Sequence, residues 1–116
     1  MDAHKSDLAQ MSAEHLRARR RALAERLGDV EHMLAGSLAG QSRRCGRPGC
    51  RCADGEPHGP YAYFTPRRGG RGRARYVPAA LEDVVRHYLR RGAEVEAALA
   101  EISAINAELL ARRELR

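Results

Sequence analysis

All three cysteines of this 116-residue chain and one histidine fall within fourteen residues, 45–58. The four side chains are those of Cys45, Cys50, Cys52 and His58. Thiolates and imidazoles are common ligands of Zn²⁺, and four of them complete a tetrahedral structural site. Glycine and proline between the first two cysteines allow the chain to turn around one ion. The spacing therefore predicts a structural Zn²⁺ site with these four ligands.

The spacing leaves alternatives open, because Cys-x4-Cys-x-Cys-x5-His is not a common zinc-finger pattern. Asp54, Glu56 or a residue from a second chain could supply the fourth ligand. An iron–sulfur cluster is a second reading, and a loop of free thiols is a third. Paired carboxylates, a phosphate-binding glycine loop and a Ser/His/Asp arrangement are all missing from the sequence. We therefore expect a protein that is not an enzyme, with redox chemistry by free cysteines as the weakest option.

Positive charge is concentrated in the middle of the chain. The net charge is +6. Residues 43–76 hold nine arginines and two acids, a balance of +7, whereas the remainder holds twelve basic and thirteen acidic residues, a balance of −1. Four of the five Phe and Tyr residues lie between positions 61 and 76. Guanidinium groups pair with phosphates and aromatic rings stack on bases, so this segment predicts nucleic-acid binding.

The predicted nucleic-acid contacts, with DNA favoured over RNA, are Arg43, Arg44, Arg47, Arg51, Arg67, Arg68, Arg71, Arg73, Arg75, Tyr61, Tyr63 and Tyr76. The tyrosines have a second reading, in which they pack the hairpin rather than stack on bases. The alternative for the arginines is that they only keep an exposed hairpin soluble or pair with acids on the helices. That alternative leaves most of the local charge unexplained, because the helical parts are already balanced.

The composition favours helices held by a metal over a large core. The chain has one Phe, four Tyr and no Trp. Its apolar runs are shorter than the ~18–20 residues that cross a bilayer, and no signal peptide is expected at its N-terminus. We therefore expect a cytoplasmic protein without a membrane partner, whose reduced thiols bind metal rather than form disulfides.

Residues 6–38 show the three- and four-residue spacing of an amphipathic helix, with Leu16, Leu23, Leu27, Val30 and Leu34 on one face. A second helix is predicted after Pro78, with a heptad seam of apolar positions. The seam consists of Val85, Tyr88, Gly92, Val95, Leu99, Ile102, Asn106 and Leu109. Between the helices, residues 61–65 and 73–77 are β-prone and flank an arginine- and glycine-rich turn.

These elements predict a mainly α fold with a small β insert. An antiparallel coiled-coil hairpin, formed by helices in residues 1–40 and 78–116, would carry a zinc-stapled β-hairpin, residues 41–77, at its tip. In the competing arrangement each seam pairs with another copy, which would give a homodimer through the helices. A polar residue at a core position of a coiled coil fixes register, so Asn106 favours some self-association.

The insert resembles a small uncharacterised family from bacteria and phages. The resemblance rests on Cys-Gly-Arg-Pro-Gly-Cys-Arg-Cys at 45–52, His-Gly-Pro-Tyr at 58–61 and Arg-Tyr-Val-Pro at 75–78. It covers about 34 residues and implies that His58 belongs to the motif. Members resemble accessory genes of mobile elements, sometimes near recombinases, which implies a context of DNA transactions.

We therefore expect a non-enzymatic, zinc-stabilised nucleic-acid-binding accessory protein, linked to mobile-element recombination. The alternative is an adaptor whose helical seams recruit a protein partner such as a recombinase. In that case the zinc site would be purely structural.

Overall fold

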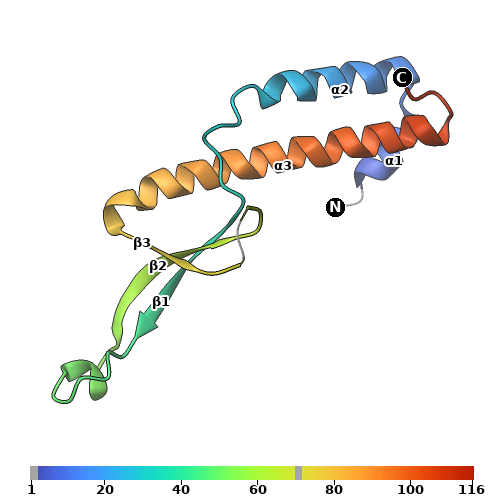
Figure 1. Cartoon of the computed structure of the whole chain (residues 1–116). Helices are drawn as coiled ribbons and strands as arrows, with labels where there is room; N and C mark the ends of the chain where they lie inside the picture. Colours follow the sequence, from blue (N-terminus) through green and yellow to red (C-terminus); the bar gives the residue numbers. More distant parts are fainter. Residues whose placement is uncertain (1–2, 70–71) are drawn as a thin grey trace. The chain divides into compact units, whose positions relative to one another are not determined.

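The computed structural model describes residues 3–69 and 72–116. In chain order the elements are α1 (Ala3–Gln10), α2 (Ala13–Leu27), β1 (Gly36–Arg43), the 3₁₀ turn η1 (Arg51–Ala53), β2 (His58–Pro66), β3 (Arg75–Val77), the 3₁₀ turn η2 (Ala79–Leu81) and α3 (Glu82–Ala111) (Figure 1). The chain forms two compact units. The helical unit comprises residues 1–31 and 93–116, and the sheet unit comprises residues 32–92.

The helical unit packs α2 against the second part of α3, and the two helices run in opposite directions (Figure 1). Its buried core consists of Leu8, Leu16, Leu23, Ile105 and Leu109. At the edge of this core the Arg19 guanidinium donates two hydrogen bonds to the Glu101 carboxylate, at 2.7 and 3.0 Å. Among the described residues, no helix is both long enough and apolar enough to span a membrane.

The prediction of one helix over residues 6–38 is wrong in three places. Ser12 interrupts it: its side chain accepts a hydrogen bond from the His15 amide at 3.1 Å and so caps a new helix, α2. Gly28, with a φ of +37°, ends α2 after Leu27. Residues 36–43 are a strand instead of helix or loop. Val30, predicted on the buried face, is 49% exposed.

The predicted helix after Pro78 is confirmed as α3, and its buried positions follow the predicted heptad seam in part. Val95 and Leu109 are buried, whereas Leu99 is 49% exposed and Ile105 is fully buried instead. Asn106 accepts a hydrogen bond from Arg20 of the same chain at 2.7 Å. This polar position therefore has a partner within the helical unit, and its presence no longer indicates self-association.

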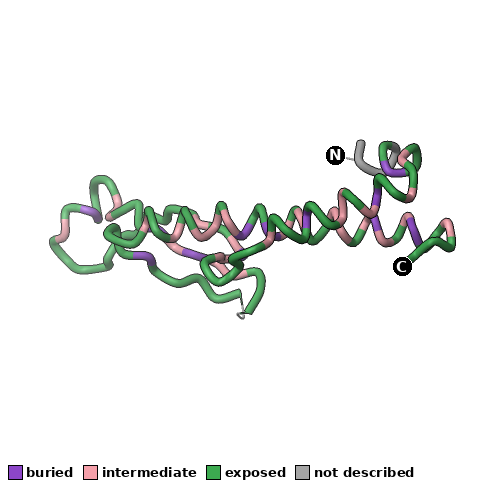
Figure 2. The backbone as a smooth tube through the Cα atoms, turned by 90° about the horizontal axis from the view of Figure 1, so that it is seen from above, coloured by how far each residue is buried: buried purple, intermediate pink, exposed green. Residues whose placement is uncertain are grey.

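The sheet unit contains an antiparallel three-stranded sheet in the order β1-β2-β3. One face is buried, where Ala62, Phe64 and Val77 form a core with the half-buried Leu34, Leu38, Val85 and Leu89. Val85 and Leu89 belong to the first part of α3, so this helix covers that face. Figure 2 shows the buried positions as short purple segments separated by exposed backbone. The two predicted strands are confirmed as β2 and β3, while β1 was not predicted.

Within the sheet unit, the chain leading into β1 passes very close to α3. The Leu34 amide donates a hydrogen bond to the Tyr88 carbonyl at 3.0 Å. A Cβ atom on Gly92 would overlap the Leu34 carbonyl group, and Gly92 is buried. Glycine at this helical position therefore permits a backbone-to-backbone contact that any other residue would block.

We expect Gly92→Ala to destabilise the protein by about 1–3 kcal/mol, because the overlap with Leu34 outweighs the gain in helix propensity. Ala93→Gly at the exposed neighbouring position is the matched control, with an expected loss of about 1 kcal/mol from propensity alone. Thermal unfolding followed by circular dichroism measures both. A higher midpoint for Gly92→Ala than for the native chain would contradict the close contact.

Candidate metal centre

The connection between β1 and β2 folds back on itself and brings four distant side chains together. Its base is closed by the pairing of Arg43 with His58, after a register shift between Gln41 and Arg43. Gly46 and Gly49 have φ angles of +75° and +80°, which let the chain turn tightly between the first two cysteines. Cys52 lies in the 3₁₀ turn η1 and is buried, with an exposed fraction of 2%. We call residues 44–58 the knuckle.

The donor atoms of Cys45, Cys50, Cys52 and His58 all lie within 4.8 Å of one another. The Cys45 and Cys52 sulfurs are 3.6 Å apart, and the Cys50 sulfur is 3.4 Å from His58 Nε2. Bond lengths of about 2.3 Å to sulfur and 2.0–2.1 Å to nitrogen, in a tetrahedron, put these pairs about 3.8 and 3.6 Å apart. The four residues could therefore hold one tetrahedral metal ion.

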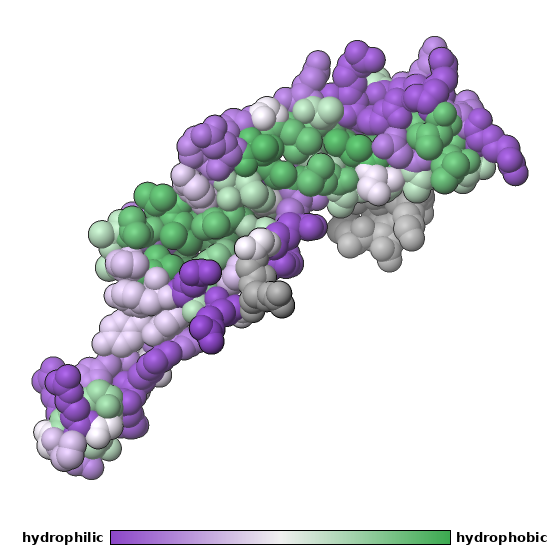
Figure 3. Space-filling view, viewed as in Figure 1, coloured by the Kyte–Doolittle hydropathy of each residue, from purple (hydrophilic) through white to green (hydrophobic). Residues whose placement is uncertain are grey.

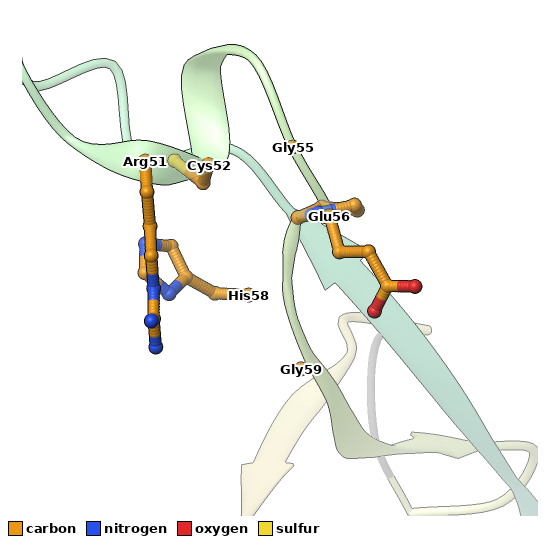
Figure 4. Close-up of a pocket in the computed structure, with 7 residues that line it drawn as sticks. Arg51, Cys52, Gly55, Glu56, His58 and Gly59 are labelled. Atoms are coloured by element: carbon orange, nitrogen blue, oxygen red, sulfur yellow. The ribbon is translucent and has the colours of Figure 1, made fainter.

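The carboxylates considered as alternative fourth ligands are not part of this cluster, which contains neither Asp54 nor Glu56. Figure 4 shows the His58 ring directed from β2 toward the turn that carries Cys52, while the Glu56 side chain points the opposite way. All four donors come from one chain, so the geometry needs no ligand from a second copy. The structure brings together the four residues that the spacing predicted.

Hydrogen bonds inside the knuckle hold its backbone in this shape. The Cys45 amide donates a hydrogen bond to the Cys52 sulfur at 3.4 Å. The Arg44 guanidinium donates to the carbonyl oxygens of Cys52 and Gly55, the latter at 2.8 Å. Arg44, predicted as a nucleic-acid contact, is thus engaged in ordering the knuckle.

The thiols influence one another's ionisation. The backbone hydrogen bond at Arg47, followed by hydrogen bonds with His58, Cys50 and Cys52, lowers the pKa of Cys45 to about 6. At Cys50, a backbone hydrogen bond with Cys52 favours the thiolate, but the Cys52 and Cys45 side chains outweigh it and raise the pKa. Crowded sulfurs therefore resist joint ionisation, and a divalent cation would remove that cost.

The predicted aromatic residues lie on the sheet face opposite the one that α3 covers. Tyr63 pairs with Tyr76 across the strands, and their ring centroids are 5.9 Å apart. The Tyr61 and Tyr76 centroids are 6.2 Å apart, in an edge-to-face arrangement. The Arg43 guanidinium lies over the Tyr63 ring, 5.1 Å from its centroid. We call Tyr61, Tyr63, Tyr76 and Arg43 the tyrosine face.

The predicted arginines are not gathered at one tip. Arg47 and Arg51 are exposed in the knuckle, at the β1–β2 end of the sheet, whereas Arg67, Arg68 and Arg73 are exposed in the β2–β3 connection at the other end. Arg75 pairs with Phe64 and so belongs to the helix-facing side. Arg71 lies outside the described residues. Figure 3 shows strongly hydrophilic atoms over both the knuckle and the sheet, with paler atoms among them.

The expectation of a zinc-stapled hairpin at the tip of the insert is therefore corrected in its connectivity. The knuckle joins β1 to β2, a hairpin that the sequence did not reveal. The arginine-rich turn joins β2 to β3 and lies at the opposite end of β2. The cause is β1, which pairs with β2 along most of its length and turns a two-stranded insert into a three-stranded sheet.

The chain belongs to the family described as Domain of unknown function (DUF6788), which matches residues 13–87. The match runs from the start of α2, through the knuckle and the whole sheet, into the first part of α3. It is longer than the motif that carried the resemblance in the sequence. No curated protein and no solved structure is similar enough to match this chain.

We expect the purified protein to bind one Zn²⁺ per chain, and His58→Ala to weaken this affinity at least about a hundred-fold, because a direct ligand is removed. Competition with a chromophoric chelator measures the affinity. His87→Ala, at an exposed histidine on α3, is the matched control and should bind zinc normally. Unchanged zinc affinity in His58→Ala would reassign the fourth ligand.

We expect removal of the metal to unfold the knuckle and leave the helical unit intact, because the knuckle contains only one buried apolar residue whereas the helices share a five-residue core. Hydrogen exchange of the zinc-loaded and chelator-treated protein tests this. Protection should disappear at the amides of Cys50, Ala53 and Asp54, which bond within the knuckle. Protection should persist in α2 and in residues 93–111; unfolding there as well would contradict separate stabilisation.

Proposed function

We propose that this member of the DUF6788 family is a non-enzymatic nucleic-acid-binding protein with a structural Zn²⁺ in its knuckle. The observation that carries the proposal is the concentration of arginine on the sheet unit, next to exposed aromatic rings. We favour DNA over RNA as the target, because the motif of the knuckle resembles that of accessory proteins of mobile elements. We place this activity in the cytoplasm.

The charge distribution supports this proposal. Residues 43–76 carry nine arginines against two acids, so the segment cannot neutralise itself. The helical parts of the chain differ in their balance, because the residues outside 43–76 carry twelve basic and thirteen acidic side chains. Arg19 pairs with Glu101 and Arg112 with Glu108, each at 2.7 Å. A segment with a net charge of +7 attracts a polyanion and releases its counterions on binding.

The metal supports the proposal by position. Arg47 lies between Cys45 and Cys50 in the sequence, and Arg51 lies between Cys50 and Cys52. A Zn²⁺ ion with three thiolates and one imidazole has a complete coordination shell, which is typical of a structural site. The ion would therefore fix the backbone from which two exposed arginines project. Its role would be to order the binding surface rather than to supply chemistry.

The second candidate function is a protein-interaction adaptor, in which the helices bind a partner such as a recombinase or a second copy of the chain. Exposed apolar residues on and after α3 favour this reading. Leu99 is 49% exposed, Leu110 63% and Leu115 48%. Truncating α3 would abolish function under this alternative, whereas neutralising the arginines of the sheet unit would abolish it under the first.

We expect zinc-loaded protein to bind labelled DNA with an affinity that falls steeply with salt, measured by fluorescence anisotropy at several salt concentrations. The slope of log affinity against log salt should be about −0.9 per phosphate neutralised on duplex and about −0.7 on a single strand. In the double variant Arg47→Gln/Arg73→Gln the slope should become shallower by about 1 for each arginine that no longer neutralises a phosphate.

The matched control removes the same charge elsewhere. Arg21→Gln/Arg90→Gln alters two exposed helical arginines outside residues 43–76 and should leave the slope unchanged. Equal decreases of affinity in both double variants would mean that only net charge matters. Absence of binding at low salt would move the function to the helices and a protein partner.

A further inference from the structure

We infer that the tyrosine face binds single-stranded nucleic acid, with unpaired bases stacked on Tyr61 and Tyr76. This inference rests on the proposed function and specifies which surface and which class of nucleic acid it uses. It follows from the strand register, the exposure of the rings, the geometry between them and the placement of the arginines.

The strand register separates the two faces of the sheet. Ala62 pairs with Val77, and these two residues with Phe64 form the core under α3. Side chains alternate between faces along a strand, so Tyr61 and Tyr63 project to the other face, as does Tyr76. Tyr61 is 38% exposed and Tyr76 is 56% exposed. Two large rings are thus presented on the face that the described part of α3 does not cover.

The geometry between the rings leaves room for stacking. Tyr76 contacts both other tyrosines in edge-to-face fashion, with interplanar angles of 76° to Tyr61 and 63° to Tyr63. Edge-to-face contacts fix the orientation of rings without covering both sides of each. Arg43 occupies one side of Tyr63. Tyr63 is therefore the packing member of the group, and the more exposed Tyr61 and Tyr76 are the ones that can accept a base.

Exposed arginines stand in the connections before and after β2, so a nucleic-acid strand lying along β2 would have cationic side chains near both ends. β2 has nine residues, which corresponds to about 30 Å. Arg47 and Arg51 belong to the connection that precedes β2, Arg73 belongs to the connection that follows it, and the Arg43 guanidinium lies over the Tyr63 ring. A cationic track with aromatic rings between its ends is the combination that binds single strands without sequence preference.

A duplex fits this surface less well. Base pairing and stacking hide both faces of every base inside a double helix, so rings on a sheet face cannot reach them without unstacking. A single strand exposes its bases at no such cost. The duplex-binding alternative would require the arginine-rich turn to enter a groove, and in that case the tyrosines would contribute little to affinity.

The test compares a labelled single strand of about 16 nucleotides with the same sequence annealed to its complement, using zinc-loaded full-length protein at matched salt. The single strand should bind more tightly. Tyr61→Leu and Tyr76→Leu should each weaken its binding by about ten-fold or more, whereas Tyr61→Phe and Tyr76→Phe should retain it, because a phenyl ring still stacks.

An independent readout comes from intrinsic fluorescence. The chain has no tryptophan, and three of its four tyrosines belong to the tyrosine face. Stacking of bases should therefore quench the emission of Tyr61 and Tyr76, two of the four tyrosines, and the Leu variants should show less of this quenching. Thermal midpoints and zinc content verify that each variant is folded. If the variant at one tyrosine fails to fold, the variant at the other tyrosine still tests the inference.

The outcomes separate the two proposals. Tighter duplex binding, or Leu variants that bind like the native chain while Arg47→Gln/Arg73→Gln does not, would overturn the single-strand inference and leave the proposed function standing. No binding of either probe would overturn both. Single-strand preference with ring-dependent affinity and quenching would support both.

Discussion

The contact between the Leu34 backbone and α3 at Gly92 fixes which face of the sheet α3 covers. It anchors the chain just before β1, so Leu38 faces the helix and β2 follows with Ala62 and Phe64 on the same side. Because strand side chains alternate with a period of two, this assignment places the tyrosines on the opposite face. A backbone contact permitted by one glycine thus separates a buried face from an aromatic, exposed one.

The elements with strong local signals could be predicted from the sequence. β2 and β3 are rich in aromatic and β-branched residues, and α3 begins after a proline with acids in its first turn. β1 has no such signal, because Gly-Ser-Leu-Ala-Gly-Gln-Ser-Arg lacks alternation and favours no regular structure. It becomes a strand by pairing with β2, which is a tertiary interaction. The leucine spacing before it predicted a helix through residue 38 and therefore gave no sign of this strand. The break at Ser12 was readable as a helix cap.

The candidate site divides in the same way. Cys45, Cys50, Cys52 and His58 could be identified because few other roles suit these side chains at such short spacing. The roles of the surrounding arginines could not, since they depend on register and turn geometry. Arg44 precedes Cys45 and Arg51 lies between Cys50 and Cys52, but the sequence alone does not show that the Arg44 guanidinium donates hydrogen bonds to knuckle carbonyls. Likewise, Tyr76 and Arg75 are neighbours that belong to opposite faces.

The knuckle combines candidate metal ligands and arginines in one short segment. The effect of the metal on the local charge can be compared with its effect on the local structure. Three thiolates with Zn²⁺ carry a net charge of −1, whereas three protonated thiols carry none, so loss of the metal changes a local balance of +7 by only one unit. Electrostatic attraction for a polyanion would hardly change, and would rise slightly. Under the proposed function, any dependence of nucleic-acid binding on zinc would then come from the ordering of Arg47, Arg51 and the adjoining end of β2. The metal would be a geometric requirement rather than an electrostatic one.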